Sequence, residues 1–115
     1  MTEWSEVDVL TCFESEPKIG EDRLSFHYVT ERSGYRLSFT IWPYDEDIYI
    51  VLHGPSQSLP LLDVWLHDCT AVRYAKTGEV ESLSFRYRDL DRLKPLAYQA
   101  AELRVRPDFS FYVTR

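Results

Sequence analysis

Apolar and polar residues alternate along most of the chain, from about Asp22 to Val113. Successive side chains of a β-strand point to opposite faces of the sheet, so an alternating segment buries one face and exposes the other. The apolar positions of these segments are Leu24-Phe26-Tyr28, Leu37-Phe39-Ile41, Ile48-Ile50-Leu52, Leu62-Val64-Leu66, Leu83-Phe85-Tyr87 and Phe109-Phe111-Val113. We therefore expect a mainly β fold, an antiparallel sandwich or a curved, partly closed sheet of about seven or eight strands.

Three segments need a separate interpretation. A further strand is predicted around Val7–Phe13. One short α-helix is predicted near residues 94–102, because Leu93, Ala97 and Ala101 recur at roughly helical spacing. The alternation fails at residues 67–71, where a bend would let the chain pass from one sheet to another.

Length and composition favour one cytoplasmic domain. A chain of 115 residues suits a single core, and no linker interrupts it, so we expect residues 1–115 to form a single domain. The acidic start lacks the basic and apolar stretches of a signal peptide, and no apolar run reaches the ~20 residues that span a bilayer. In the cytoplasm, Cys12 and Cys69 would remain reduced thiols.

The net charge of −6 is concentrated in residues 1–22, where acidic residues far outnumber the single base, Lys18. An acidic protein of this kind is a poor match for nucleic acid or anionic membranes, which attract basic surfaces. The acidic segment either pairs with arginines of the same molecule, such as Arg104 and Arg106, or attracts a basic partner protein.

The turns between strands decide which residues face one another. An even number of turn residues keeps apolar side chains opposite apolar side chains in an antiparallel pair. Turns of four residues are therefore predicted at 31–34 and 43–46. Under this register Arg23 faces Trp42 across neighbouring strands.

The polar side of these strands carries large aromatic residues. The candidate binding residues on this side are Arg23, Trp42, Tyr49, His53, Asp63, Trp65 and His67. Tyr49 would face Trp65, and Arg23 over Trp42 would fit a cation–π contact. Aromatic anchors among polar groups are typical of protein interfaces. Alternatively, the helix or another sheet covers this side, and the aromatic residues form a second core.

Motifs for catalysis or metal binding are absent from the sequence. It has no glycine-rich phosphate loop, no zinc-spaced Cys/His set and no nucleophile elbow. His67 and Cys69 would need two further metal ligands, and Asp63 lies roughly 13 Å from His67 along a strand, too far to orient it. We therefore expect no catalytic residue, no metal and no cofactor, and favour a non-enzymatic protein.

Three hypotheses about function follow. The first is a small interaction protein, an inhibitor or immunity-type partner, that binds another protein through the aromatic-polar sheet face or the acidic N-terminal segment. The second is a small-ligand-binding β-barrel or a weak hydrolase, with a pocket between sheet and helix near Trp42, Tyr49, His53 and Trp65. The third is a homodimer joined through the aromatic face. Nucleic acid and membranes are not expected as partners.

Overall fold

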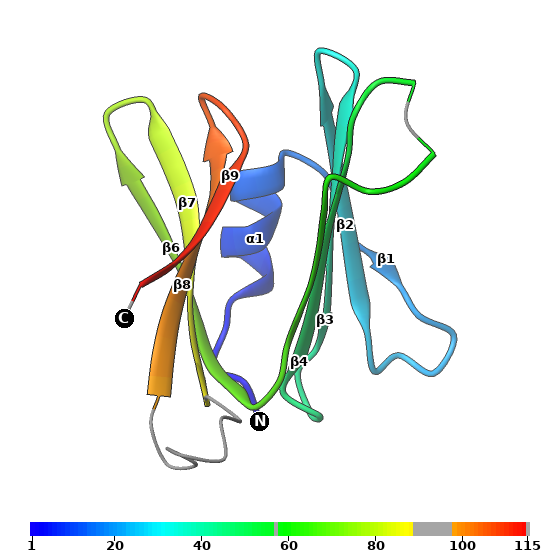
Figure 1. Cartoon of the computed structure of the whole chain (residues 1–115). Helices are drawn as coiled ribbons and strands as arrows, with labels where there is room; N and C mark the ends of the chain where they lie inside the picture. The colour runs from blue at the N-terminus through cyan, green and yellow to red at the C-terminus, as the bar shows by residue number, and fades with distance from the viewer. Residues whose placement is uncertain (57, 89–97, 115) are drawn as a thin grey trace.

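The computed structural model, which describes residues 1–56, 58–88 and 98–114, is mainly β. Its elements are α1 (Glu6–Phe13), β1 (Lys18–Ile19), β2 (Phe26–Arg32), β3 (Tyr35–Trp42), β4 (Asp47–His53), β5 (Leu62–Leu66), β6 (Cys69–Thr77), β7 (Val80–Arg88), β8 (Tyr98–Arg106) and β9 (Ser110–Thr114). The strands form two open antiparallel sheets, ordered β1-β2-β3-β4-β5 and β6-β7-β8-β9. Helix α1 lies between the two sheets (Figure 1). The predicted sandwich-like β architecture is confirmed.

The strand predicted at Val7–Phe13 is wrong, because this segment belongs to α1. The Ser5 side chain caps the helix by accepting a hydrogen bond from the backbone N–H of Asp8, 3.2 Å away. At the other end, Glu14 adopts a left-handed conformation and donates its backbone N–H to the Leu10 carbonyl. The residues that α1 buries, at helical spacing, are Val9, Cys12 and Phe13. Alternation over so short a segment did not distinguish a strand from a helix.

The helix predicted near residues 94–102 is also misplaced. Residues 89–97 lie outside the described part of the chain, and the segment from Tyr98 belongs to β8. Ala101 lies opposite Phe85 and is buried. Backbone pairing with β7 on one side and β9 on the other outweighs the helical preference of the alanines in this segment.

The register between β3, β4 and β5 agrees with the prediction. Trp42 lies opposite Asp47 across the four-residue turn that joins β3 to β4. Tyr49 lies opposite Trp65 in the next pair of strands. The alternation of the sequence therefore predicts correctly which side chains of β3, β4 and β5 lie on each face of the sheet.

The register between β2 and β3 is shifted by two residues from the prediction. The turn consists of Ser33 and Gly34 alone, both with positive φ (53° and 84°), as in a type I′ hairpin. The shift places Phe26 opposite Ile41 and leaves each side chain on its predicted face. It also removes Arg23 from the strand pairing.

The chain passes from one sheet to the other between β5 and β6, as the sequence predicts. Leu66 ends β5, and Cys69 begins β6 in the second sheet. Asp68 between them has a positive φ of 51°, and a bulge follows between Cys69 and Ala71. A left-handed residue and a bulge together turn the strand direction sharply.

The core lies where the inner faces of both sheets meet α1. The ring of Phe13 lies 6.0 Å from that of Tyr28 and 5.8 Å from that of Phe39. Phe39 in turn stacks on Phe85 of the second sheet. Since α1 and the second sheet occupy the inner face of the first sheet, the predicted polar side of β3, β4 and β5 is its outer face (Figure 1).

Candidate functional site

Four ring side chains form a continuous stack on the outer face of the five-stranded sheet. We call Trp42, Tyr49, Trp65 and His67 the aromatic stack. The Trp65 ring lies 4.2 Å from that of Tyr49 at an interplanar angle of 17°, and 5.5 Å from that of Trp42 at 21°. His67 continues the stack, 6.0 Å from Trp65 and nearly parallel to it. Trp65 is 48% exposed, so the stack presents aromatic surface to solvent.

Two carboxylates orient the polar members of the aromatic stack. The His67 Nδ1 atom lies 2.9 Å from the Asp47 carboxylate. The Tyr49 hydroxyl donates a hydrogen bond to Asp63, and this bond, with smaller contributions from desolvation and the negative charge of Asp63, raises the pKa of Tyr49. Both rings are thereby held by hydrogen bonds as well as by stacking.

Charged side chains of both signs lie on the outer face. Asp47 and Asp63 lie among the rings of the aromatic stack. Arg36 lies opposite His53 at the other end of β3 and β4. Burial, followed by the charges of Arg36 and Lys18, lowers the pKa of His27 on the same face. The two aspartates therefore lie with the aromatic stack, whereas Arg36 is paired with Glu31, 4.0 Å away, and Lys18 lies on the β1 edge strand.

Two of the predicted site residues do not belong to the aromatic stack. Arg23 precedes β2 in a left-handed conformation with φ of 59°, and the two-residue shift of β2 leaves it without the predicted pairing to Trp42. His53 shares the outer face but lies four residues beyond Tyr49, roughly 13 Å along the strand. The structure brings together the remaining five, together with Asp47: Trp42, Tyr49, Asp63, Trp65 and His67.

The acidic N-terminal segment is divided between several places in the fold. Glu3 lies 3.8 Å from Arg73, and Glu14 lies 3.1 Å from Arg106. These contacts agree with the interpretation that arginines of the same molecule neutralise part of the segment. Glu16 and Glu21 are exposed at the β1 edge of the sheet, opposite the β5 edge.

The predicted pocket between sheet and helix near Trp42 and Trp65 is wrong, as is the predicted ligand-binding barrel. Neither sheet closes, and the space between sheet and helix is filled by the core. The aromatic stack lies on the outer face of the five-stranded sheet, on the side opposite the helix.

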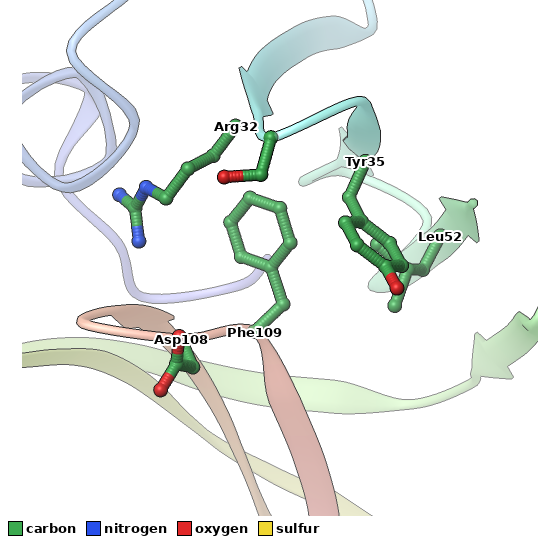
Figure 2. Close-up of a pocket in the computed structure, with 6 residues that line it drawn as sticks. Arg32, Tyr35, Leu52, Asp108 and Phe109 are labelled. Carbon is green, nitrogen blue, oxygen red and sulfur yellow. The ribbon is translucent and has the colours of Figure 1, made fainter. Parts of the chain in front are cut away.

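A cavity of about 350 Å³ lies instead where the β2–β3 turn meets the β8–β9 turn. Figure 2 shows the Phe109 ring between Arg32 on one side and Tyr35 with Leu52 on the other. The Arg32 guanidinium lies 5.3 Å over the Phe109 ring and donates to the Val105 carbonyl at 2.9 Å. Because Arg32 belongs to the first sheet and Val105 to the second, this contact joins the two sheets. Sequence reasoning missed the cavity, since it forms only when two distant turns pack together.

In the part of the chain that the structure describes, the thiols and acidic side chains form no metal centre. Cys12 and Cys69 are free and buried, and burial raises the pKa of each to about 12. Cys69 lies in the core, whereas His67 lies on the outer face. In the described residues, no group of three or more His, Cys, Asp and Glu side chains is placed to hold a metal ion.

Comparison with known proteins finds one informative likeness. No protein-family model and no curated protein matches the chain significantly. A chain of the solved contact-dependent growth inhibition toxin–immunity protein complex from Klebsiella pneumoniae 342 is similar in structure, with a TM-score of 0.80 and 17% sequence identity. The match covers 98% of this chain and 96% of that chain, so the fold is shared over its full length. In the described part of this chain, no helix is long and apolar enough to cross a membrane.

Proposed function

We propose that this chain is an immunity-type protein of the cytoplasm, which binds one toxin protein and blocks its activity. The full-length likeness to a chain of a toxin–immunity protein complex carries the proposal. The exposed aromatic stack supports it, because Trp and Tyr with a polar rim are typical anchors of tight protein interfaces. We place the binding surface on the outer face of β3, β4 and β5, at the residues Trp42, Tyr49, Asp63, Trp65 and His67.

Such a protein needs no reaction chemistry of its own. Neutralisation requires a rigid complementary surface that covers or distorts the site of the toxin, and an outer sheet face backed by a packed core supplies that rigidity. The net charge of −6 would speed association with a basic toxin, because complementary charge raises the association rate.

The test is a protection assay in bacteria. Each of the two genes that flank the gene for this chain is expressed alone and together with the chain. We expect one flanking product to arrest growth, and co-expression of this chain to restore it. Isothermal titration calorimetry on the purified pair should then give a saturating complex of one to one.

Two results would contradict the proposal. Growth arrest by this chain expressed alone would identify it as a toxin. Failure to protect against either flanking product, with the chain shown to be folded and expressed, would exclude the immunity role. A Phe85→Ala variant, which removes a core side chain and lowers stability, serves as the control in which protection should weaken.

A further inference from the structure

We infer that the aromatic stack receives an arginine side chain of the bound partner protein, with the guanidinium stacked on Trp65 and paired with Asp63. This inference rests on the proposed function and states the chemistry that the partner must present at this surface.

Trp65 keeps 48% of its surface exposed, although Tyr49, Trp42 and His67 stack against it. Tyr49 covers the face directed toward β4, at 4.2 Å and 17°. In the described residues β5 is the edge strand of its sheet and pairs with β4 alone. The exposed part of the indole therefore lies at an edge of the sheet, where a partner protein can reach it. A planar cation stacks well on an indole face of this kind.

Asp63 is an exposed residue on the same strand as Trp65. It precedes Trp65 by two residues on the same strand, so both side chains project from the outer face. It accepts the hydrogen bond from Tyr49, and a carboxylate has lone pairs for several donors. An arginine can contact Trp65 and Asp63 at the same time, because its flat guanidinium can stack on the indole while its N–H groups donate hydrogen bonds to the carboxylate. A lysine ammonium is a point charge and cannot make the stacked contact in the same way.

Charge complementarity distinguishes this occupant from a second copy of the chain. A symmetric dimer through the aromatic stack would bring Asp47 and Asp63 of both copies together, in a protein that already carries a net charge of −6. The strand register puts two basic residues on this face, Arg36 at the far end of β3 and Lys18 on β1, the edge strand opposite β5. A cationic group from a different protein meets no such repulsion.

The experiment measures the affinity of the full chain for its growth-arresting partner at about 50 mM and about 300 mM salt. Asp63→Asn should weaken binding by about tenfold at low salt and by less at high salt, because exposed charge pairs are screened. Glu79→Gln is the matched control: it removes the same charge from an exposed turn of the other sheet and should change affinity less than about twofold. Trp65→Leu should weaken binding by about tenfold, and Trp65→Phe by less, because phenylalanine retains a ring face.

The outcomes separate this inference from the proposed function. If the unaltered chain protects cells and binds its partner, but Asp63→Asn and Trp65→Leu bind equally well, the inference is overturned and the proposed function stands. If the unaltered chain neither binds nor protects, both are overturned. If Trp65→Leu converts a dimeric chain to a monomer without changing partner affinity, the aromatic stack is a self-contact and the inference is again overturned. Urea unfolding of each variant checks that the fold is retained.

Discussion

Phe39 and Phe85 stack on each other although they belong to different sheets, with ring centroids 5.9 Å apart and an interplanar angle of 23°. Phe39 also lies 5.8 Å from Phe13 of α1. This one side chain therefore contacts both of the layers that pack against the inner face of the first sheet. Phe39 and Phe85 are both almost fully buried.

Removal of this contact should destabilise the whole fold. Phe85→Ala leaves a cavity between the two sheets, and we expect the free energy of unfolding in urea to fall by about 3–5 kcal/mol. Tyr44→Ala is the control, because Tyr44 is 68% exposed and its loss should change stability by less than about 0.5 kcal/mol. Equal effects of the two substitutions would contradict the observed packing.

Ser5→Ala should weaken the start of α1. The substitution removes the side chain that accepts the Asp8 backbone N–H, which costs about 1 kcal/mol of stability. Thr11→Ala provides the comparison: its exposed hydroxyl donates only to the Val7 carbonyl within the helix, and alanine favours helices, so stability should stay the same or rise slightly. Were residues 7–13 a strand, the two substitutions would not differ in this way.

The buried ion pair of Glu81 with Arg106 should make stability depend on pH in acid. The hydrogen bond from Tyr74, together with the hydrogen bond and charge of Arg106, outweighs desolvation and lowers the pKa of Glu81. A carboxyl whose pKa is lower in the folded state contributes stability at neutral pH, and that contribution is lost as the pH falls through the folded pKa.

The Glu81→Gln variant tests this dependence. At pH 7 we expect it to be less stable than the unaltered protein by roughly 1–3 kcal/mol, and the difference should shrink below about pH 4. Urea unfolding of both proteins between about pH 7 and about pH 2.5 measures the stability difference and its decrease in acid. A stability difference that stays constant down to pH 2.5 would show that the charge of Glu81 is not responsible.

Tyr49 should ionise at a higher pH than an exposed tyrosine does. Its hydroxyl donates to Asp63, and ionisation would both break that bond and place two negative charges together. In Asp63→Ala the Tyr49 pKa should fall toward its ordinary value, as followed by tyrosine absorbance difference spectra against a Tyr49→Phe reference. An unchanged titration would show that the hydrogen bond does not form in solution.

Both thiols should react slowly in the native state. Burial raises the pKa of Cys12 and of Cys69 to about 12, so little thiolate is present at neutral pH. A thiol reagent should label both cysteines promptly in urea and neither in native buffer over the same time. Fast labelling of one of them in native protein would indicate local opening around that residue.

The sequence predicted the faces of the β meander well, because alternation fixes them regardless of the finer register. Tyr49 and Trp65 were paired correctly, since the inward sides of both strands are strongly apolar. The Ser33–Gly34 turn was predicted with the wrong length, because a two-residue and a four-residue turn have the same parity. That error alone placed Arg23 beside Trp42.

The remaining errors concern segments where local pattern and tertiary context disagree. Ser5 followed by Asp8 is a helix-start signal that the strand prediction at Val7–Phe13 did not take into account. The alanines of β8 prefer a helix in isolation, but the strands beside them supply hydrogen bonds on both sides. The contact between Arg32 and Val105 joins residues far apart in sequence, and no local pattern reports it.

The alternation of the meander also separates the positions that specify the fold from those that would specify a partner. Between Phe26 and His67, inward side chains build the core while their outward neighbours form one continuous surface. Substitutions of exposed outward residues such as Asp63 and Trp65 should therefore change the surface while the inward set is left intact. In a fold of this kind, the residues of the outer surface can vary with little effect on the packing of the core.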